Sequence, residues 1–227
     1  MGSVVFSLSL VLALACGAAD IDLMLTPGAA PRDAALKTAD LVLRLADADP
    51  AVRREAFKTV AAEFSARTFS NDVLPPLRKG LTDPDAAIRR DAGFALAGIA
   101  SKVYMSSGSA TSSVFGRKVV VDFTQDAELR AALLEGTRSP DPKVRKYAPL
   151  ALGLAYPKSP DIEAALAAQW AVETSTPARQ NIVVAVSRAR YASEGSRALL
   201  DEALRDPDRV VRIRARRALK RLGAAPH

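Results

Sequence analysis

Five arginines recur at one fixed position in a repeated pattern, and they are the side chains best suited to bind an anion. They are Arg53, Arg89, Arg145, Arg179 and Arg212. Each stands four residues after an Asp or a Ser, at Asp49, Asp85, Asp141, Ser175 and Asp208. A guanidinium group binds phosphate or carboxylate through paired hydrogen bonds. One interpretation of these arginines is therefore a basic ladder that binds phosphates or an acidic partner.

The residues around each arginine predict the start of an α-helix. Asp or Ser at the first position can cap a helix, and Pro50 and Pro142 stand at the first helical position, where proline is tolerated. Apolar residues follow at +3, +7 and +11, as at Ile88, Ala92 and Leu96, which gives one helical stripe. The +3 residues of successive copies are 36, 56, 34 and 33 residues apart. A period in the middle thirties is typical of helix–turn–helix units stacked in a solenoid.

The pattern Asp-Pro-x-Val-Arg resembles the second helix of a HEAT repeat, particularly the short bacterial type. The copies that match it best are Asp49-Pro50-Ala51-Val52-Arg53 and Asp141-Pro142-Lys143-Val144-Arg145. The resemblance implies an all-α fold, a right-handed, armadillo-type helical-repeat solenoid over residues 34–223. About five helix pairs are expected, over 34–65, 73–102, 126–156, 161–192 and 195–223. Such repeats serve many unrelated proteins, so the resemblance predicts the fold strongly and the function weakly.

The resemblance also implies a second interpretation of the arginines. Each would form an ion pair with the capping Asp of its own repeat or of a neighbouring repeat, and the ladder would be structural. Asp and Arg recur together in four of the five copies, which favours this interpretation. Ser175 replaces the Asp in the fourth copy, which leaves Arg179 short of one expected partner.

Residues 103–123 interrupt the pattern and account for the long step between the second and third copies. Two β-branched or aromatic runs flank a Ser- and Gly-rich stretch, which predicts a non-helical insertion, either a β-hairpin or a long loop. Insertions in solenoids lie outside the helical stack and often bind partners. Arg117 and Lys118 are the candidate binding residues of this segment. The alternative is an excursion that has no partner.

The last helix pair carries most of the positive charge of the chain. The whole chain has a net charge of +7, and residues 195–227 alone contain nine basic and four acidic residues. A terminal repeat needs a polar outer face for solubility, but this density also favours contact with an anionic lipid or cell-envelope polymer. The candidate partner-binding residues on and before this helix are Trp170, Arg179, Arg214, Arg216, Arg217, Lys220 and Arg221. Trp170 is interpreted either as a core residue or as a surface anchor.

The first 19 residues resemble an export signal, particularly that of a bacterial lipoprotein. Val4 to Ala15 is almost wholly apolar, yet shorter than the roughly 20 residues of a membrane span, and small residues follow it. Cys16 is the candidate lipidation site; the alternatives are ordinary cleavage near this point and a retained anchor. No Lys or Arg precedes Arg32, which departs from the signal pattern. With 20–33 as a linker, we expect an exported protein of the periplasm or cell envelope, and the alternative is the cytoplasm.

The composition excludes chemistry that needs several histidines or paired cysteines. The chain has one histidine, His227, and one cysteine, which excludes a zinc site built from them, an internal disulfide and histidine catalysis in the repeats. We therefore expect no catalytic residues, no cofactor and no metal. The leading hypothesis is a monomeric, non-enzymatic scaffold for an unidentified protein partner. The alternatives are a basic nucleic-acid-binding protein and a lyase-type HEAT-like enzyme.

Overall fold

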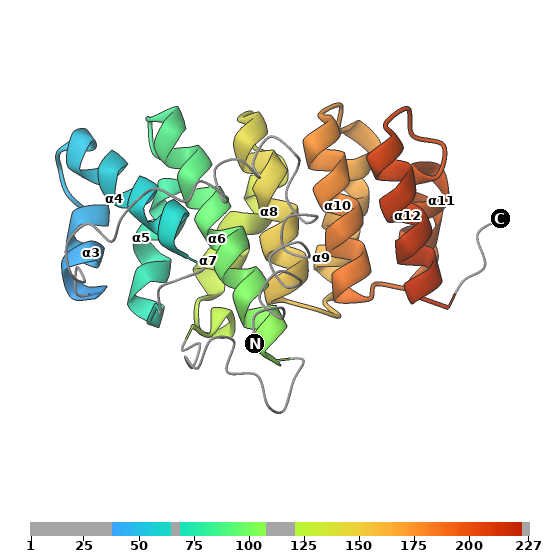
Figure 1. Ribbon diagram of the computed structural model, residues 1–227, viewed down its shortest axis with the longest axis horizontal. Coiled ribbons are helices and arrows are strands. Elements are labelled where there is room, and N and C mark those ends of the chain that lie inside the picture. The colour runs from blue at the N-terminus through green and yellow to red at the C-terminus, as the bar shows by residue number, and fades with distance from the viewer. Residues whose placement is uncertain (1–37, 65–68, 108–120, 224–227) are drawn as a thin grey trace, which may run out of the picture. The chain divides into compact units, whose positions relative to one another are not determined.

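The computed structural model describes residues 38–64, 69–107 and 121–223, and these residues form α-helices and short 3-10 helices, with no strand among them (Figure 1). The α-helices alternate between first and second members of a pair. The first helices are α3 (Thr38–Leu45), α5 (Leu74–Gly80), α7 (Ala127–Gly136), α9 (Pro160–Val172) and α11 (Glu194–Ala203). The second helices are α4 (Pro50–Glu63), α6 (Ala86–Ser107), α8 (Pro142–Ala155), α10 (Thr176–Ala189) and α12 (Arg209–Arg221). The all-α prediction is confirmed.

The helices of the repeat array lie in two layers. Each second helix packs against the first helix of its own pair, and α4, α6, α8, α10 and α12 also pack against one another in that order. Figure 1 shows these second helices side by side in the layer nearest the viewer, with α7, α9 and α11 behind them. The described helices therefore stack as a solenoid, as the repeat period predicts.

The predicted capping residues begin four of the second helices. The Oδ1 atoms of Asp49, Asp85 and Asp141 each accept the backbone N–H two residues further on, at 2.8 Å. Asp208 accepts the N–H of Val211 at 2.9 Å. Ser175 was also expected to cap, and this prediction is wrong, because its side chain makes no capping hydrogen bond. Substituting such a cap by Ala typically costs about 0.5–2 kcal/mol.

Close packing between the second helices depends on small residues. The stripe predicted from Ile88, Ala92 and Leu96 is fully buried on α6. A Cβ atom on Gly153 of α8 would lie only 2.7 Å from the Cβ of Ala185 on α10 and 2.9 Å from its carbonyl oxygen. Since backbone stands on the far side of that contact, only glycine allows α8 and α10 to approach this closely.

The segment expected to be a non-helical insertion begins as helix. Helix α6 continues to Ser107, so the prediction of a non-helical start at residue 103 is wrong for 103–107. Residues 108–120, with Arg117 and Lys118, lie outside the described residues. The chain is described again from Val121, which is buried, and Phe123 begins the 3-10 helix η3 (Phe123–Gln125). The hydroxyl of Tyr156 donates to the carbonyl of Phe123 at 3.0 Å, which ties the end of the segment to α8.

The expected export signal over 1–19, with Cys16, and the linker over 20–33 also lie outside the described residues. Among the helices that are described, none combines the length and the apolar character needed to span a membrane.

Candidate partner-binding surface

The repeated arginines hold the turns that precede the second helices. In four copies the Nη1 atom donates to two consecutive backbone carbonyls of its own turn, at 2.7–3.0 Å. The four arginines are Arg53, Arg89, Arg145 and Arg212. Arg53, for example, contacts the carbonyls of Asp47 and Ala48, both at 2.9 Å. These bonds give the turn carbonyls partners that no helix supplies.

Four of the repeated arginines also join their repeat to the next: Arg53, Arg89, Arg145 and Arg179. The partner is usually an acidic residue two positions before the next capping residue, which we call the turn acid. Arg53 pairs with Asp83 at 3.0 Å, Arg145 with Glu173 at 3.1 Å, and Arg179 with Asp206 at 2.6 Å. Where Ser139 replaces the turn acid, Arg89 pairs instead with the capping residue Asp141 at 2.5 Å. The arginine column is therefore an inter-repeat ladder, because its acidic partners lie in the neighbouring repeat.

Two ladder carboxylates have pKa values below their ordinary range. For Glu173, burial acts to raise the pKa. Hydrogen bonds from the Ser175 backbone, Gln169 and Arg145 outweigh this effect, so the pKa is lowered overall. For Asp141, burial again acts upward and is outweighed by Arg89 and the backbone N–H of Lys143. Both carboxylates are thus held in the charged form that the ladder needs.

A proline inside α8 explains one cross-repeat contact of the ladder region. Pro149 has no N–H to donate to the carbonyl of Arg145, four residues earlier. The Nε2 atom of Gln169, on α9, donates to that carbonyl at 2.9 Å and to Glu173 at 3.1 Å. A side chain of the fourth repeat therefore supplies the hydrogen bond that the third repeat lacks.

Charge is divided between the two layers in the C-terminal half of the array. The second helices α8, α10 and α12 carry twelve Lys and Arg residues and no Asp or Glu. The first helices α7, α9 and α11 carry seven acidic and two basic residues. We call the side formed by α8, α10 and α12 the basic layer. Only Arg145, Arg179 and Arg212 of its basic residues belong to the ladder.

The predicted candidates fall into three groups. Arg216, Arg217, Lys220 and Arg221 are exposed on α12, and Arg214 of the same helix donates to the carbonyl of Gln180. Arg179 belongs to the ladder, and Trp170 is buried with 4% exposure, which agrees with its interpretation as a core residue. Arg117 and Lys118 are not among the described residues.

Sequence reasoning missed the basic residues of α8 and α10 in this layer. They are Lys143, Lys146 and Arg188. The ammonium of Lys146 lies 4.6 Å from the ring centroid of Tyr147, a cation–π distance. The signal that reveals these residues is the difference in charge between first and second helices. Dense clustering of basic residues marks only α12.

The described residues contain no group of three or more His, Cys, Asp or Glu side chains that could hold a metal ion. The arrangement of this surface is instead suited to electrostatic contact with an anionic partner.

Comparison with known proteins supports the repeat architecture. A family model for HEAT repeats matches residues 130–220. No curated protein sequence matches this chain. Among solved structures, the designed armadillo repeat protein YIII(Dq)4CqI is similar at 19% identity and a TM-score of 0.57, with 82% of each chain covered.

A second designed armadillo repeat protein, YIII(Dq.V1)4CPAF, was solved in complex with the peptide (KR)4. It is similar at 18% identity and a TM-score of 0.58, covering 82% of this chain and 81% of that one. At these identities the similarity establishes an armadillo-like helical-repeat fold and leaves the function open.

Proposed function

We propose that this chain is a non-enzymatic repeat scaffold whose basic layer binds an acidic segment of a partner protein. The observation that carries the proposal is the separation of charge: α8, α10 and α12 present basic side chains without a single carboxylate of their own. Adjacent helices of one sign create an extended positive potential that attracts an acidic chain.

The side chains that we assign to binding lie outside the ladder. Lys143 on α8 and Arg217 on α12 are exposed, and Lys146 on α8 is half-buried. Ladder arginines are held by turn carbonyls and carboxylates, and are unsuited to a second anionic partner. The second helices pack side by side, so a bound segment can contact several repeats in succession.

The similar armadillo repeat protein solved with (KR)4 supports this mode of binding. In that complex a repeat protein binds a basic peptide. In this chain the basic layer favours an acidic peptide instead. Complementary charge contributes mainly to specificity and to the rate of association.

The proposal is tested with a fluorescein-labelled (Glu-Asp)4 peptide and fluorescence anisotropy. We expect saturable binding that weakens as salt increases, because exposed charges are screened. A Lys143→Gln, Lys146→Gln, Arg217→Gln variant should bind about tenfold more weakly, at roughly 0.5 kcal/mol for each exposed contact.

The matched control removes three positive charges from first helices, through Arg44→Gln, Lys79→Gln and Arg197→Gln. It should bind the peptide almost as well as the unmodified chain. If both variants bound the peptide equally weakly, net charge alone would explain the binding and the proposal would be wrong. Tighter binding of a single-stranded oligonucleotide of the same charge would favour the nucleic-acid alternative.

We also propose that the mature protein is exported to the periplasm or cell envelope. The support is the apolar run from Val4 to Ala15 and the small residues after it.

A further inference from the structure

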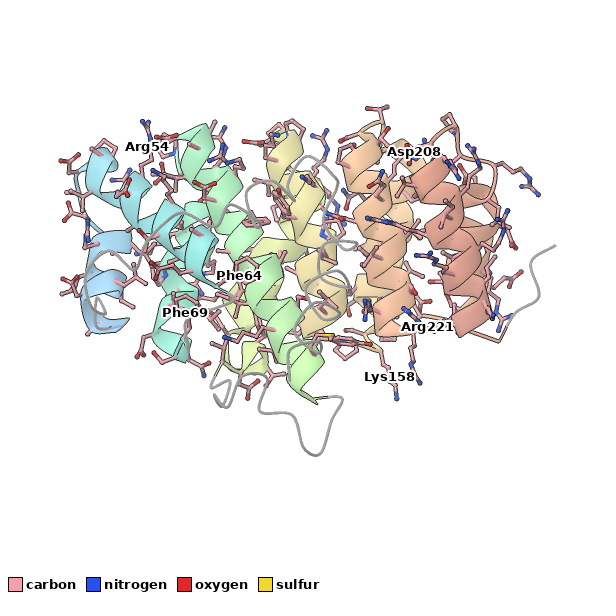
Figure 2. The ribbon with its side chains drawn as sticks, in the orientation of Figure 1. Arg54, Phe64, Phe69, Lys158, Asp208 and Arg221 are labelled. Atoms are coloured by element: carbon pink, nitrogen blue, oxygen red, sulfur yellow. The ribbon has the colours of Figure 1, made fainter. Side chains whose placement is uncertain are left out.

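Three arginines gather where α10 and α12 end. Arg188 lies in the last turn of α10, Arg190 follows that helix, and Arg221 is the last residue of α12. Arg221 donates from Nη1 to Ser187 Oγ at 2.9 Å, which draws it onto the end of α10. In Figure 2, Arg221 lies at the lower edge of the array, opposite Arg54 and Asp208 at the upper edge.

Contacts from another repeat fix the position of Arg188. The hydroxyl of Tyr104, near the end of α6, donates to the Arg188 carbonyl at 3.0 Å. The guanidinium of Arg188 lies 5.9 Å from the centroid of the Tyr104 ring. Arg190 has a left-handed backbone conformation with a φ of 56°, which ends α10 and turns the chain. The three side chains therefore come from a folded edge rather than from one flexible segment.

The hydrogen bond to Ser187 places Arg221 at the end of α10, and Ser187 stands one residue before Arg188 and three before Arg190 in the chain. Partial burial lowers the pKa of Arg221, and the positive charges of Arg188 and Arg190 act in the same direction, whereas Tyr104 acts in the opposite direction. Among the described residues, the ion pairs found in the array include none of these three arginines. Each helix carboxyl end contributes about half a negative charge. The ends of α10 and α12 together therefore offset about one of the three positive charges and leave about two.

We propose that Arg188, Arg190 and Arg221 form a binding site for a phosphate-bearing anion. A phosphate monoester carries a charge of about −1.5 to −2 near neutral pH, which matches the excess charge at this edge. Guanidinium groups donate in a planar fork that suits phosphate oxygens. The site goes beyond the proposed function, because it takes a compact anion at the helix ends and does not require an acidic peptide.

The first experiment titrates pyrophosphate into the full chain at low salt and follows binding by calorimetry. We expect one saturable site. Arg188→Gln, Arg190→Gln and Arg221→Gln together should abolish it, and Arg190→Gln alone should weaken it about tenfold, as for one charged hydrogen bond. Because Arg190 is exposed, its single substitution keeps the test valid even if the triple variant folds poorly.

The matched control removes three exposed arginines that precede or begin second helices, through Arg138→Gln, Arg205→Gln and Arg209→Gln. It should bind pyrophosphate as the unmodified chain does. The absence of a saturable site, an unchanged Arg190→Gln variant, or an equal loss in the control would each overturn the proposal.

A second experiment distinguishes the two sources of such an anion. The chain is sedimented with phosphatidylcholine vesicles that either contain or lack phosphatidic acid. Cosedimentation that requires phosphatidic acid and is lost in Arg190→Gln would identify a lipid headgroup. Pyrophosphate binding without cosedimentation would identify a free phosphate-bearing ligand, and both results support the site.

Discussion

The guanidinium of Arg179 lies 4.4 Å from the centroid of the Trp170 ring, and its Nη2 atom lies 2.6 Å from Asp206 Oδ2. Arg179 and Trp170 are both candidate partner-binding residues of the sequence, with a structural role as the alternative for each, and the structure places them against each other. The Nε atom of Arg179 and the Nε1 atom of Trp170 are buried without a hydrogen-bond partner among the described residues. In the fourth repeat, the face of the Trp170 ring thus contacts the ladder arginine, whereas in the other repeats turn carbonyls do so.

Trp170→Ala should reduce the free energy of unfolding by about 3–5 kcal/mol, as expected for a large buried aromatic residue. Trp170→Phe should cost clearly less, because it keeps a ring beneath Arg179 and removes an indole N–H that has no hydrogen-bond acceptor among the described residues. Urea denaturation followed by circular dichroism measures both variants. An equal loss in the two would contradict a specific contribution from the aromatic face.

Gln169→Leu should destabilise the chain by about 1–3 kcal/mol, because it leaves the Arg145 carbonyl without a donor. Pro149→Ala restores a backbone N–H to that carbonyl. The effect of Gln169→Leu should therefore be smaller in the Pro149→Ala background, and a double-mutant cycle measures the coupling. Additive effects would mean that Gln169 acts mainly through its contact with Glu173.

The ladder pair Arg89 and Asp141 should show a coupling free energy of about 1–2 kcal/mol, because its side chains are 25% and 10% exposed. Arg89→Met and Asp141→Asn form the cycle, and Asn retains an oxygen for the helix cap. Lys58 and Glu55 provide the control, an ion pair within α4 with side chains 70% and 60% exposed. The control should couple by less than about 0.5 kcal/mol. Equal couplings would contradict a structural ladder.

Stability should fall in acid because the folded-state pKa of Glu173 is lowered. Its contribution is fully present above the unfolded pKa of about 4.3 and is lost as pH falls through the folded value. Glu173→Gln should therefore be less stable than the unmodified chain near pH 7 and should lose less stability below about pH 4. Denaturation between pH 3 and pH 7 compares the two slopes, and identical slopes would contradict the assignment.

The intact mass of the mature protein tests the export proposal. Cleavage before Cys16 should remove 15 residues, and lipidation should add the mass of acyl chains to the new N-terminus. A Cys16→Ser variant distinguishes lipidation from ordinary cleavage, because only lipidation requires the thiol. An uncleaved chain in the cytoplasmic fraction would refute export.

The repeat pattern was enough to predict where the second helices begin, because capping and apolar spacing are local properties. Asp49, Asp85, Asp141 and Asp208 all cap the expected helices. The ladder partners were predicted less well. The pattern pointed to the capping residues, whereas Asp83, Glu173 and Asp206 lie two positions earlier and vary in type too much to stand out.

Contacts between distant residues could not be predicted from spacing. Tyr104 contacts Arg188 across 84 positions, and this relationship depends on how α6 and α10 end relative to each other. The sequence predicted the basic character of α12, where Arg221 lies. Arg190 was not predicted, because its own left-handed backbone conformation cannot be inferred from local composition.

The ladder bears on how the number of repeats in this protein can change during evolution. Arg53 and Arg145 each contact their own turn and the turn acid of the next repeat, so these two joints between repeats are built in the same way. Loss of the unit containing α9 and α10 would bring Arg145 to Asp206 in place of Glu173, which occupies the equivalent turn position. Gene duplication or deletion of whole units would therefore preserve an ion pair of this kind, and the number of repeats could change over evolutionary time while this type of joint is kept.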